Sequence, residues 1–195
     1  QAQKFISEPL PNKGINTDTL GYLSYDHGKS CKGFLNDHFN TKLLRPGSFK
    51  NPDVHKLQDI TGLKWRSISR RDSVILLHDM FNNNEDKVVF ILDTYCSPHK
   101  QQALMATGSD DSFALWVNGD SVTTVHEARA LDPNSDWIRI QLRKGMNTFL
   151  FKIGQGVAHW GLTYKIRDQN ALKRYLKTHL ADMYGDLPAS AIVKD

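Results

Sequence analysis

The fold of this chain is decided by the stretch Gly108-Ser109-Asp110-Asp111-Ser112-Phe113-Ala114-Leu115-Trp116-Val117-Asn118-Gly119, which holds a polar turn, a short strand and a second turn. Large apolar residues occupy every second position from Phe113 to Val117, the period of a strand with one face on a core. The Asn118-Gly119 pair supplies the positive φ angles that a tight hairpin needs. The stretch therefore predicts a central strand that is entered through an acidic turn.

Further strand patterns lie on both sides of this stretch, separated by turn-forming clusters such as Lys144-Gly145. Lys87 to Cys96 is apolar on both faces, which is typical of a strand covered on both sides. The predicted strands lie near residues 73–78, 87–96, 101–107, 112–118, 137–142, 147–153 and 160–166. Many short strands at a spacing of roughly 8–12 residues predict an all-β fold, an antiparallel β-sandwich or jelly roll.

The alternation of apolar and polar residues also predicts the core of this sandwich. Trp116 and Trp137 fall on the faces of their strands opposite the apolar positions. A shift of one residue in register would invert every face assignment in a strand, so exposure of the core positions is a direct check. The expected core residues are Leu115, Val117, Ile138, Ile140, Leu142, Phe149 and Phe151.

The sandwich is expected to occupy residues 61–167, between two segments of different character. Residues 1–60 predict an N-terminal arm and an irregular segment packed on the sandwich. The part from Asp26 to Pro52 is rich in Gly, Asn, Asp, Lys and His, with isolated aromatics at Phe34, Phe39 and Phe49. A segment of this kind is either functional or a wrap-around arm pinned by its aromatic residues.

Residues 168–195 predict a C-terminal helix followed by a linker. Apolar residues at helical spacing follow Asp168, a suitable N-cap, and Gly185 ends the helix. These residues are Leu172, Tyr175, Leu176, Leu180 and Met183. Such a helix indicates either one module of a longer protein or an element that covers an edge of the sheet.

Composition narrows the expected partners and location. The chain of 195 residues has a net charge of only +4 with its basic residues dispersed, which disfavours nucleic acid as a partner. No run approaches the roughly 18 apolar residues of a membrane span. The start Gln1-Ala2-Gln3 resembles a mature end left by signal-peptide removal, so a secreted, periplasmic or cell-surface location is expected. Cys31 and Cys96 then form either one disulfide or two free thiols.

The sequence contains no recognisable catalytic motif. The histidines are scattered, and neither a nucleophile elbow nor a phosphate-cradling glycine loop is present. Asp26-His27 and Asp37-His38 would need partners that the sequence does not identify, and His78-Asp79 would point to opposite faces of a strand. Enzyme activity is therefore the less favoured class.

Several stretches resemble a known family when read in order. Gly108 to Ser112 leads to Leu115-Trp116-Val117-Asn118-Gly119, then come residues 142–153, Gly154-Gln155-Gly156 and Trp160-Gly161-Leu162. This order is similar to galactose-binding-like jelly-roll modules of secreted carbohydrate-active enzymes. The aspartate stretch also resembles the sugar-binding domains shared by fungal adhesins and the anthrax protective antigen. The resemblance covers about residues 60–167 and implies a glycan-binding sandwich.

In some of those domains, two adjacent aspartates hold a calcium ion that the sugar hydroxyls also touch. The resemblance thus implies a calcium role for Asp110 and Asp111, although Ser112 replaces the usual glycine after the pair. Further oxygens, such as those of Asn118 or Asp132, would be needed to complete the shell. The alternative is an acidic turn that caps the entry of the strand.

Tryptophan faces are the natural platforms for a glycan, because the polarised C–H groups of a sugar ring stack on an aromatic surface. The expected site lies where the loop after Gly154 meets the loop before Trp137. The alternative for each tryptophan is burial in the core. The predicted ligand-binding residues are Trp137, Trp160, His159, Gln155 and Trp116.

These observations favour a non-catalytic carbohydrate-binding or accessory module of a larger secreted polysaccharide-processing protein. Its expected partners are a glycan or polysaccharide and an adjacent domain of the same polypeptide. One alternative is a structural or docking module that braces a catalytic domain. Another is a small glycan hydrolase or lyase that uses the His-rich irregular segment.

Overall fold

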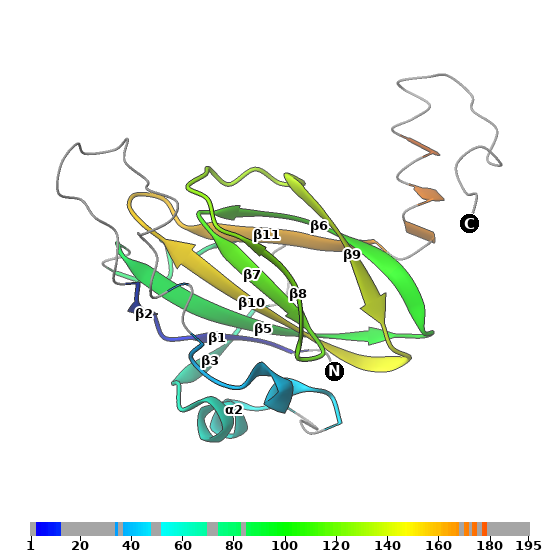
Figure 1. Ribbon diagram of the computed structural model, residues 1–195, viewed down its shortest axis with the longest axis horizontal. Coiled ribbons are helices and arrows are strands. Elements are labelled where there is room, and N and C mark those ends of the chain that lie inside the picture. Colours follow the sequence, from blue (N-terminus) through cyan, green and yellow to red (C-terminus); the bar gives the residue numbers. More distant parts are fainter. Residues whose placement is uncertain are drawn as a thin grey trace.

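The computed structural model describes residues 3–12, 34, 37–47, 52–69, 74–82, 85–167, 170–171, 173–174 and 177–178. They form two antiparallel sheets packed face to face (Figure 1). The large sheet has seven strands in the order β3-β1-β5-β10-β7-β8, with β2 paired to β5, and the small sheet has the order β4-β11-β6-β9. The predicted all-β antiparallel sandwich is confirmed.

The strand bounds follow the predicted segments closely from β5 onward. The large sheet contains β1 (Lys4–Ser7), β2 (Leu10–Pro11), β3 (Trp65–Ile68), β5 (Lys87–Ser97), β7 (Phe113–Val117), β8 (Asp120–Val125) and β10 (Gly145–Gln155). The small sheet contains β4 (Val74–Leu76), β6 (Gln101–Asp110), β9 (Asp136–Leu142) and β11 (Gly161–Arg167). β1 lies inside the large sheet between β3 and β5, so residues 4–7 are part of the sandwich itself.

The main core lies between the two sheets and confirms the predicted register. Leu115 and Phe149 of the large sheet are fully buried, and Ile140 of the small sheet is 1% exposed. Ile138 is half-buried and packs at the margin of the same cluster. Because these side chains alternate with outward-facing residues, Trp116 and Trp137 lie on the outer faces of their sheets, as predicted.

A second apolar layer covers the outer face of the large sheet. The 3-10 helix η1 (Thr41–Leu44) and the helix α2 (Val54–Thr61) lie beneath this sheet, on the side away from the small sheet (Figure 1). Phe90, Leu92 and Leu150 of the sheet pack there against residues such as Leu44 and Leu57. The central strands β5 and β10 are therefore buried on both faces, as predicted for β5.

Helix α2 is absent from the sequence prediction, although its end signals are present. The Asp53 side chain accepts the N–H of Lys56 at 2.9 Å, and Gly62 ends the helix with a φ of 70°. Leu57 is fully buried against the sheet, and Trp65 Nε1 donates to Thr61 Oγ1 at 2.8 Å. These contacts anchor the helix on the outer face of the large sheet.

The β7–β8 hairpin forms as predicted at Asn118-Gly119, with φ angles of 54° and 81°. The Asn118 amide donates to Asn147 Oδ1 at 3.0 Å and accepts the N–H of Thr148 at 3.1 Å. A Cβ atom at Gly119 would lie 2.8 Å from the carbonyl oxygen of Thr41. The glycine therefore lets residues 37–47, the covering segment, approach the hairpin.

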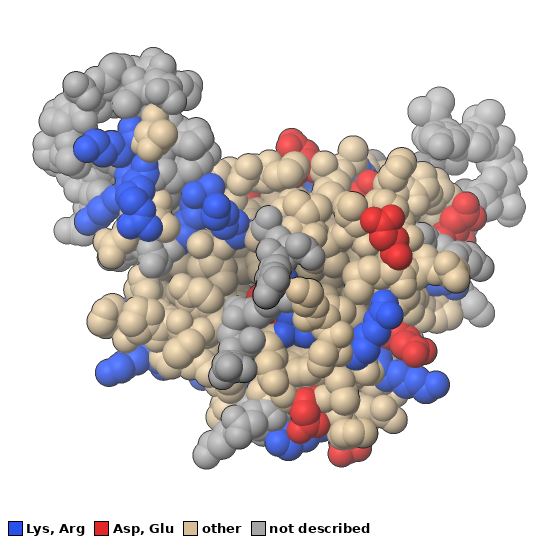
Figure 2. All heavy atoms as spheres, turned by 180° about the vertical axis from the view of Figure 1, so that it is seen from behind, with Lys and Arg blue, Asp and Glu red and all other residues tan. Residues whose placement is uncertain are grey.

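The ends of the chain are described in part. Helical residues occur at 170–171, 173–174 and 177–178, within the predicted C-terminal helix, and the apolar positions of that helix lie outside the described residues. Lys173, Arg174 and Lys177 are exposed, and Figure 2 shows Lys and Arg side chains gathered at this end. Cys96 is a free, exposed cysteine, whereas Cys31 is outside the described residues. No helix among the described residues is long and apolar enough to cross a membrane.

Candidate functional site

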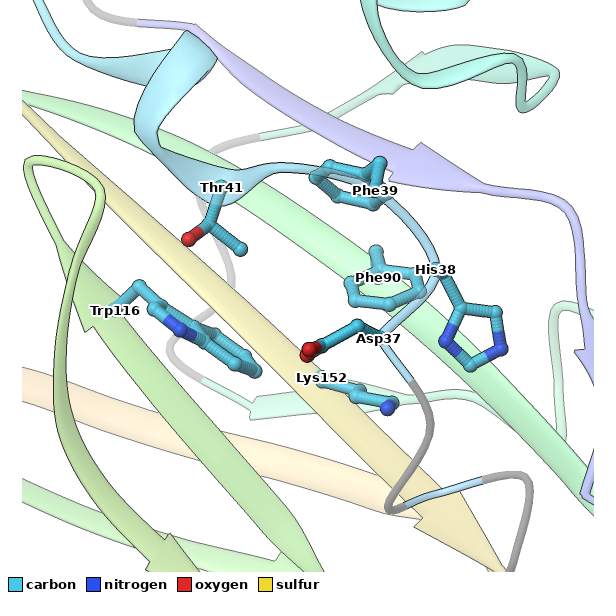
Figure 3. Close-up of a pocket in the computed structure, with 7 residues that line it drawn as sticks. All are labelled: Asp37, His38, Phe39, Thr41, Phe90, Trp116 and Lys152. Carbon is cyan, nitrogen blue, oxygen red and sulfur yellow. The ribbon is translucent and has the colours of Figure 1, made fainter.

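An open hollow lies on the outer face of the large sheet, where the covering segment crosses β7 and β10. Its outer part has a volume of about 420 Å³, within the size range of small-molecule sites. Figure 3 shows aromatic and polar side chains around it, with Trp116 on one side and His38 on the other. This Trp116 hollow is lined by Asp37, His38, Phe39, Asn40, Thr41, Phe90, Trp116 and Lys152.

Aromatic contacts hold one side of the hollow in place. The ring of Phe39 packs on that of Phe90 with centroids 5.0 Å apart, and the His38 ring meets Phe90 edge-on at 5.3 Å. Such pairs contribute roughly 0.5–1.5 kcal/mol each beyond the area that they bury. Phe34 is buried nearby and lies below the ammonium of Lys152, 5.3 Å from the ring centroid. Phe34, His38 and Phe39 are thus held against the sheet by contacts of their rings.

Polar contacts hold the other side, next to the hairpin. Thr41 Oγ1 donates to the carbonyl of Gly119 at 3.2 Å, and Thr148 Oγ1 donates to that of Leu44 at 2.8 Å. The Arg45 guanidinium forms an ion pair with Asp120 at the start of β8. The covering segment is therefore fixed at both sides of the hollow, and the lining residues Asp37 to Thr41 are held between these anchors.

Trp116 is the sequence-predicted ligand residue that lines this hollow. Its ring is half-buried on the outer face of β7, opposite the fully buried Leu115. In Figure 3 the carboxylate of Asp37 points toward the indole, and the Thr41 side chain lies above it. An aromatic face is thus combined with a carboxylate and a hydroxyl, which are the groups that orient a polar ligand in a site.

Lys152 forms part of the floor of the hollow. Its side chain is 3% exposed, and its ammonium lies 5.7 Å from the centroid of Phe90. Burial lowers the pKa of Lys152 to about 8, while the negative charge of Asp37 acts in the opposite direction. Asp37 itself is exposed. The hollow therefore places an exposed carboxylate above a buried ammonium.

The acidic turn before β7 is built into the loop end of the sandwich. Asp111 Oδ2 accepts the N–H of Gly156 at 2.8 Å, and Oδ1 accepts that of Arg129 at 3.3 Å. The loops after β8 and β10 are thereby tied to the turn. This matches the alternative of a turn that caps the strand entry. Calcium at this pair stays a prediction.

Asp110 lies in a different environment from Asp111. Burial, reinforced by the neighbouring negative charge of Asp111, raises the pKa of Asp110 to about 6. A bound cation would favour its ionised form. However, no group of three or more His, Cys, Asp or Glu side chains in the described part of the chain is placed to hold a metal ion. Asn118 lies at the opposite end of β7 and uses its amide within the hairpin, so it does not complete a shell around this pair.

The other predicted ligand residues do not converge on one site. Trp160 is fully buried in the main core, with its ring 6.0 Å from that of Phe81. The prediction of Trp160 as an exposed platform is therefore wrong, because its ring fills the space between the sheets. Trp137 is 40% exposed on the outer face of the small sheet, where the Arg167 guanidinium lies 5.7 Å from its ring centroid.

His159 and Gln155 also differ in exposure, as Trp137 and Trp160 do. His159 is exposed, and its ring meets that of His78 edge-on at 5.3 Å. The Gln155 side chain is fully buried, and both of its amide atoms lack a hydrogen-bond partner. Direct contact between Gln155 and a glycan is excluded by this burial. The predicted loop-end site therefore does not assemble from these residues.

Sequence reasoning missed most of the Trp116 hollow. In the sequence prediction, Asp37 and His38 belong only to the hydrolase alternative, and Thr41 and Lys152 have no role. One usable signal was the position of Lys152, a single charge within the apolar run Phe149-Leu150-Phe151-Lys152-Ile153. Lysine is rarely fully buried without partners, so a lysine in a strand covered on both faces marks a special environment.

Comparisons with known proteins gave distant structural likenesses only. No protein-family model and no curated protein matches the chain. A β-glucosidase from Kluyveromyces marxianus in complex with glucose is similar at 12% identity and a TM-score of 0.44, over 60% of this chain and 16% of that one. A GH31 α-xylosidase from Xanthomonas citri is similar at 14% identity and a TM-score of 0.35, over 51% of this chain and 12% of that one.

A PA14 sugar-binding domain from an RTX adhesin is similar at 15% identity and a TM-score of 0.38, over 86% of this chain and 91% of that one. The chain thus spans less than a fifth of the length of the two glycosidases. All three TM-scores are below 0.5, so nothing is inferred from these likenesses about what this chain binds.

Proposed function

We propose that this chain is a carbohydrate-binding β-sandwich module and that its glycan lies in the Trp116 hollow. The observation that carries the proposal is the convergence of an accessible indole with a carboxylate, an amide and a hydroxyl around one open space. A sugar ring needs both kinds of surface, because its C–H groups stack on an aromatic face and its hydroxyls require hydrogen-bond partners. The sequence resemblance to galactose-binding-like jelly-roll modules supports the same class of ligand.

The size and shape of the hollow suit one or two sugar rings of a longer glycan. It is open to solvent, and its lining comes from a segment that is anchored on both sides. One stacked ring contributes on the order of 0.5–1.5 kcal/mol, if sugars behave like aromatic pairs. Binding to a single module is therefore weak. Tethering to an enzyme or repetition of the module would raise the effective affinity.

An exported, non-catalytic accessory role within a larger polysaccharide-processing protein is part of this proposal. It is supported by the resemblance to modules of secreted enzymes. A calcium ion at Asp110 and Asp111 is a separate proposal, supported by the resemblance to domains in which two adjacent aspartates hold calcium. Bound calcium would neutralise the acidic turn and could supply a second contact for hydroxyl groups.

A direct test is to titrate the protein with oligosaccharides from a glycan screen while measuring the heat of binding, a readout that does not depend on any one tryptophan. The Trp116→Ala variant should lose the response, and Trp137→Ala should keep it, because Trp137 lies on the outer face of the other sheet. Loss of binding in Trp137→Ala alone would show that the glycan binds on the small sheet instead. Absence of any response from the wild-type protein would reject the proposal.

A docking role remains the second candidate, because one specific feature favours it. Val74 and Leu76 of the edge strand β4 are 39% and 40% exposed. With Ile68 and Met80 they line an open hollow of about 410 Å³ between the edges of the two sheets. Exposed apolar surface of this kind is typical of interaction sites. If no glycan binds, Leu76→Asp should weaken association with the adjacent domain of the full polypeptide.

A further inference from the structure

The Trp116 hollow contains two opposite charges that are presented in different ways. The carboxylate of Asp37 is exposed, whereas the ammonium of Lys152 is nearly inaccessible. In Figure 3 the Asp37 carboxylate points toward Trp116, and the Lys152 amino group points to the other side, toward His38. A ligand stacked on the indole can therefore contact the carboxylate directly. The ammonium acts on it only electrostatically, from within the floor of the hollow.

This arrangement disfavours charged ligands of either sign. An anionic sugar on Trp116 would place its carboxylate beside that of Asp37, and two like charges at close range repel each other. A cationic sugar would gain attraction from Asp37, but the buried ammonium of Lys152 opposes it from below. Because Lys152 is surrounded by the rings of Phe34 and Phe90, its field is weakly screened by water.

An uncharged ring satisfies the same groups without repulsion. Hydroxyl groups donate to an ionised carboxylate in charge-assisted hydrogen bonds, which are stronger than bonds between neutral groups. The two oxygens of one carboxylate can accept from two neighbouring hydroxyls of a sugar ring. The amide of Asn40 and the hydroxyl of Thr41 lie along the same rim and can take further hydroxyls.

On this basis we propose that the Trp116 hollow selects uncharged sugar rings, which donate two adjacent hydroxyl groups to Asp37 while Lys152 acts as the fixed counter-charge of that carboxylate. This inference rests on the proposed function and names the ligand class for the same site. It predicts discrimination against both uronic acids and amino sugars. It also predicts that the two charges act oppositely on the preference between charged sugars. Removal of the Asp37 charge should favour the uronic acid, and removal of the Lys152 charge should favour the amino sugar.

The test compares three sets of probes that differ mainly in charge. These are the methyl glycosides of glucose, galactose and mannose, the corresponding uronic acids, and the corresponding 2-amino sugars, titrated at pH 7 with tryptophan fluorescence. The wild-type protein should bind at least one neutral glycoside roughly tenfold tighter than its charged counterparts. Tighter binding of a uronic acid or an amino sugar would overturn the inference and leave the proposed function standing.

Two variants separate the roles of the charges. Asp37→Asn should weaken binding of the neutral glycoside about tenfold and reduce the discrimination against the uronic acid. Lys152→Met keeps a long apolar side chain and should shift the preference toward the amino sugar by about tenfold. Asp59→Asn removes the same charge from an exposed position on α2 and serves as the matched control, with unchanged affinities.

The outcomes distinguish this inference from the function on which it rests. Binding that is unaffected within twofold by Asp37→Asn would overturn the role of Asp37. If Lys152→Met unfolds, Lys152→Gln replaces it, and a thermal unfolding curve shows which variant is folded. If none of the probes and no glycan of the wider screen perturbs Trp116, the proposed function itself fails, and the inference fails with it.

Discussion

The acidic turn at Asp110-Asp111 and the Trp116 hollow both combine carboxylates with nearby tryptophan, yet the chain uses these groups differently. At the turn, Asp111 accepts backbone N–H groups from two other loops, and Trp160 behind it is fully buried. At the hollow, Asp37 is exposed and Trp116 is half-buried. The difference teaches that residue types alone do not make a binding site. Their polar atoms and faces must also be left accessible by the fold.

The largest expected effect comes from substitutions on the two faces of β7, one in the core and one at the hollow. Leu115→Ala should destabilise the protein by about 2–5 kcal/mol, because it leaves a cavity in the main core. Trp116→Ala on the other face should destabilise it by less, since part of the indole is already in water. Chemical denaturation of both variants measures the two values. Equal losses would contradict the assignment of Trp116 to an accessible site.

The next largest effect is the pH dependence of stability that the buried Lys152 causes. The pKa of Lys152 is lowered from 10.5 to about 8 in the folded chain. Below pH 8 the lysine is charged in both states, and the folded state carries the full unfavourable effect of burial. Between pH 8 and about 10.5 the folded protein releases the proton first, so its stability rises relative to a variant without this lysine.

Lys152→Met is the matching variant. Wild-type protein should gain up to about 3 kcal/mol relative to Lys152→Met between pH 8 and 10.5, as measured by urea unfolding at each pH. Other lysines and tyrosines titrate in both proteins, and the difference between the two curves removes their contribution. A difference that stays constant with pH would show that Lys152 is solvated rather than buried.

Much of the fold could be predicted from the sequence, because the signals involved are local. The period-two pattern of residues 113–117 sets the faces of β7, and Asn118-Gly119 sets the hairpin. Helix α2 was missed although Asp53 and Gly62 mark its ends. Its apolar residues are too few to stand out in a polar stretch, and the helix gains its stability from the sheet on which it lies.

The candidate site was harder to predict, because it depends on contacts between distant segments. Asp37 and Lys152 are far apart in sequence, and only the docking of residues 37–47 on β10 brings them together. The opposite error occurred at Trp160, where a turn-flanked tryptophan has the sequence context of a platform but fills the core. Accessibility is a property of the folded chain that local patterns do not encode.

The fit between the hairpin and the covering segment offers a way to disturb the hollow without replacing a residue that lines it. Gly119→Ala should destabilise the protein by roughly 1–2 kcal/mol, because alanine disfavours the φ of 81°. Its Cβ would also press on the carbonyl of Thr41. Sugar affinity should fall together with stability, whereas Gly47→Ala, where a Cβ meets no atom within 4 Å, should leave both unchanged. Retained affinity in Gly119→Ala would argue against a preformed hollow.

The acidic turn should show the smallest effect, and one with the opposite sign. Because the folded-state pKa of Asp110 is raised to about 6, ionisation above that pH opposes folding, and stability falls as the pH rises from about 4 to 6. Asp110→Asn should therefore stabilise the protein by about 1 kcal/mol at pH 7, after allowance for solvent screening. Calcium should raise the melting temperature of the wild type more than that of Asp110→Asn. An equal response of both proteins would reject calcium at this turn.

The central claim, that a sugar occupies the Trp116 hollow, is tested most directly by the indole N–H signals of the four tryptophans. These signals can be assigned in a two-dimensional ¹⁵N–¹H NMR spectrum through single Trp→Phe variants. Titration with a glycan that binds should shift the Trp116 signal progressively, while the buried Trp160 and the distant Trp137 stay in place. Movement of the Trp137 signal with an unchanged Trp116 would contradict the account.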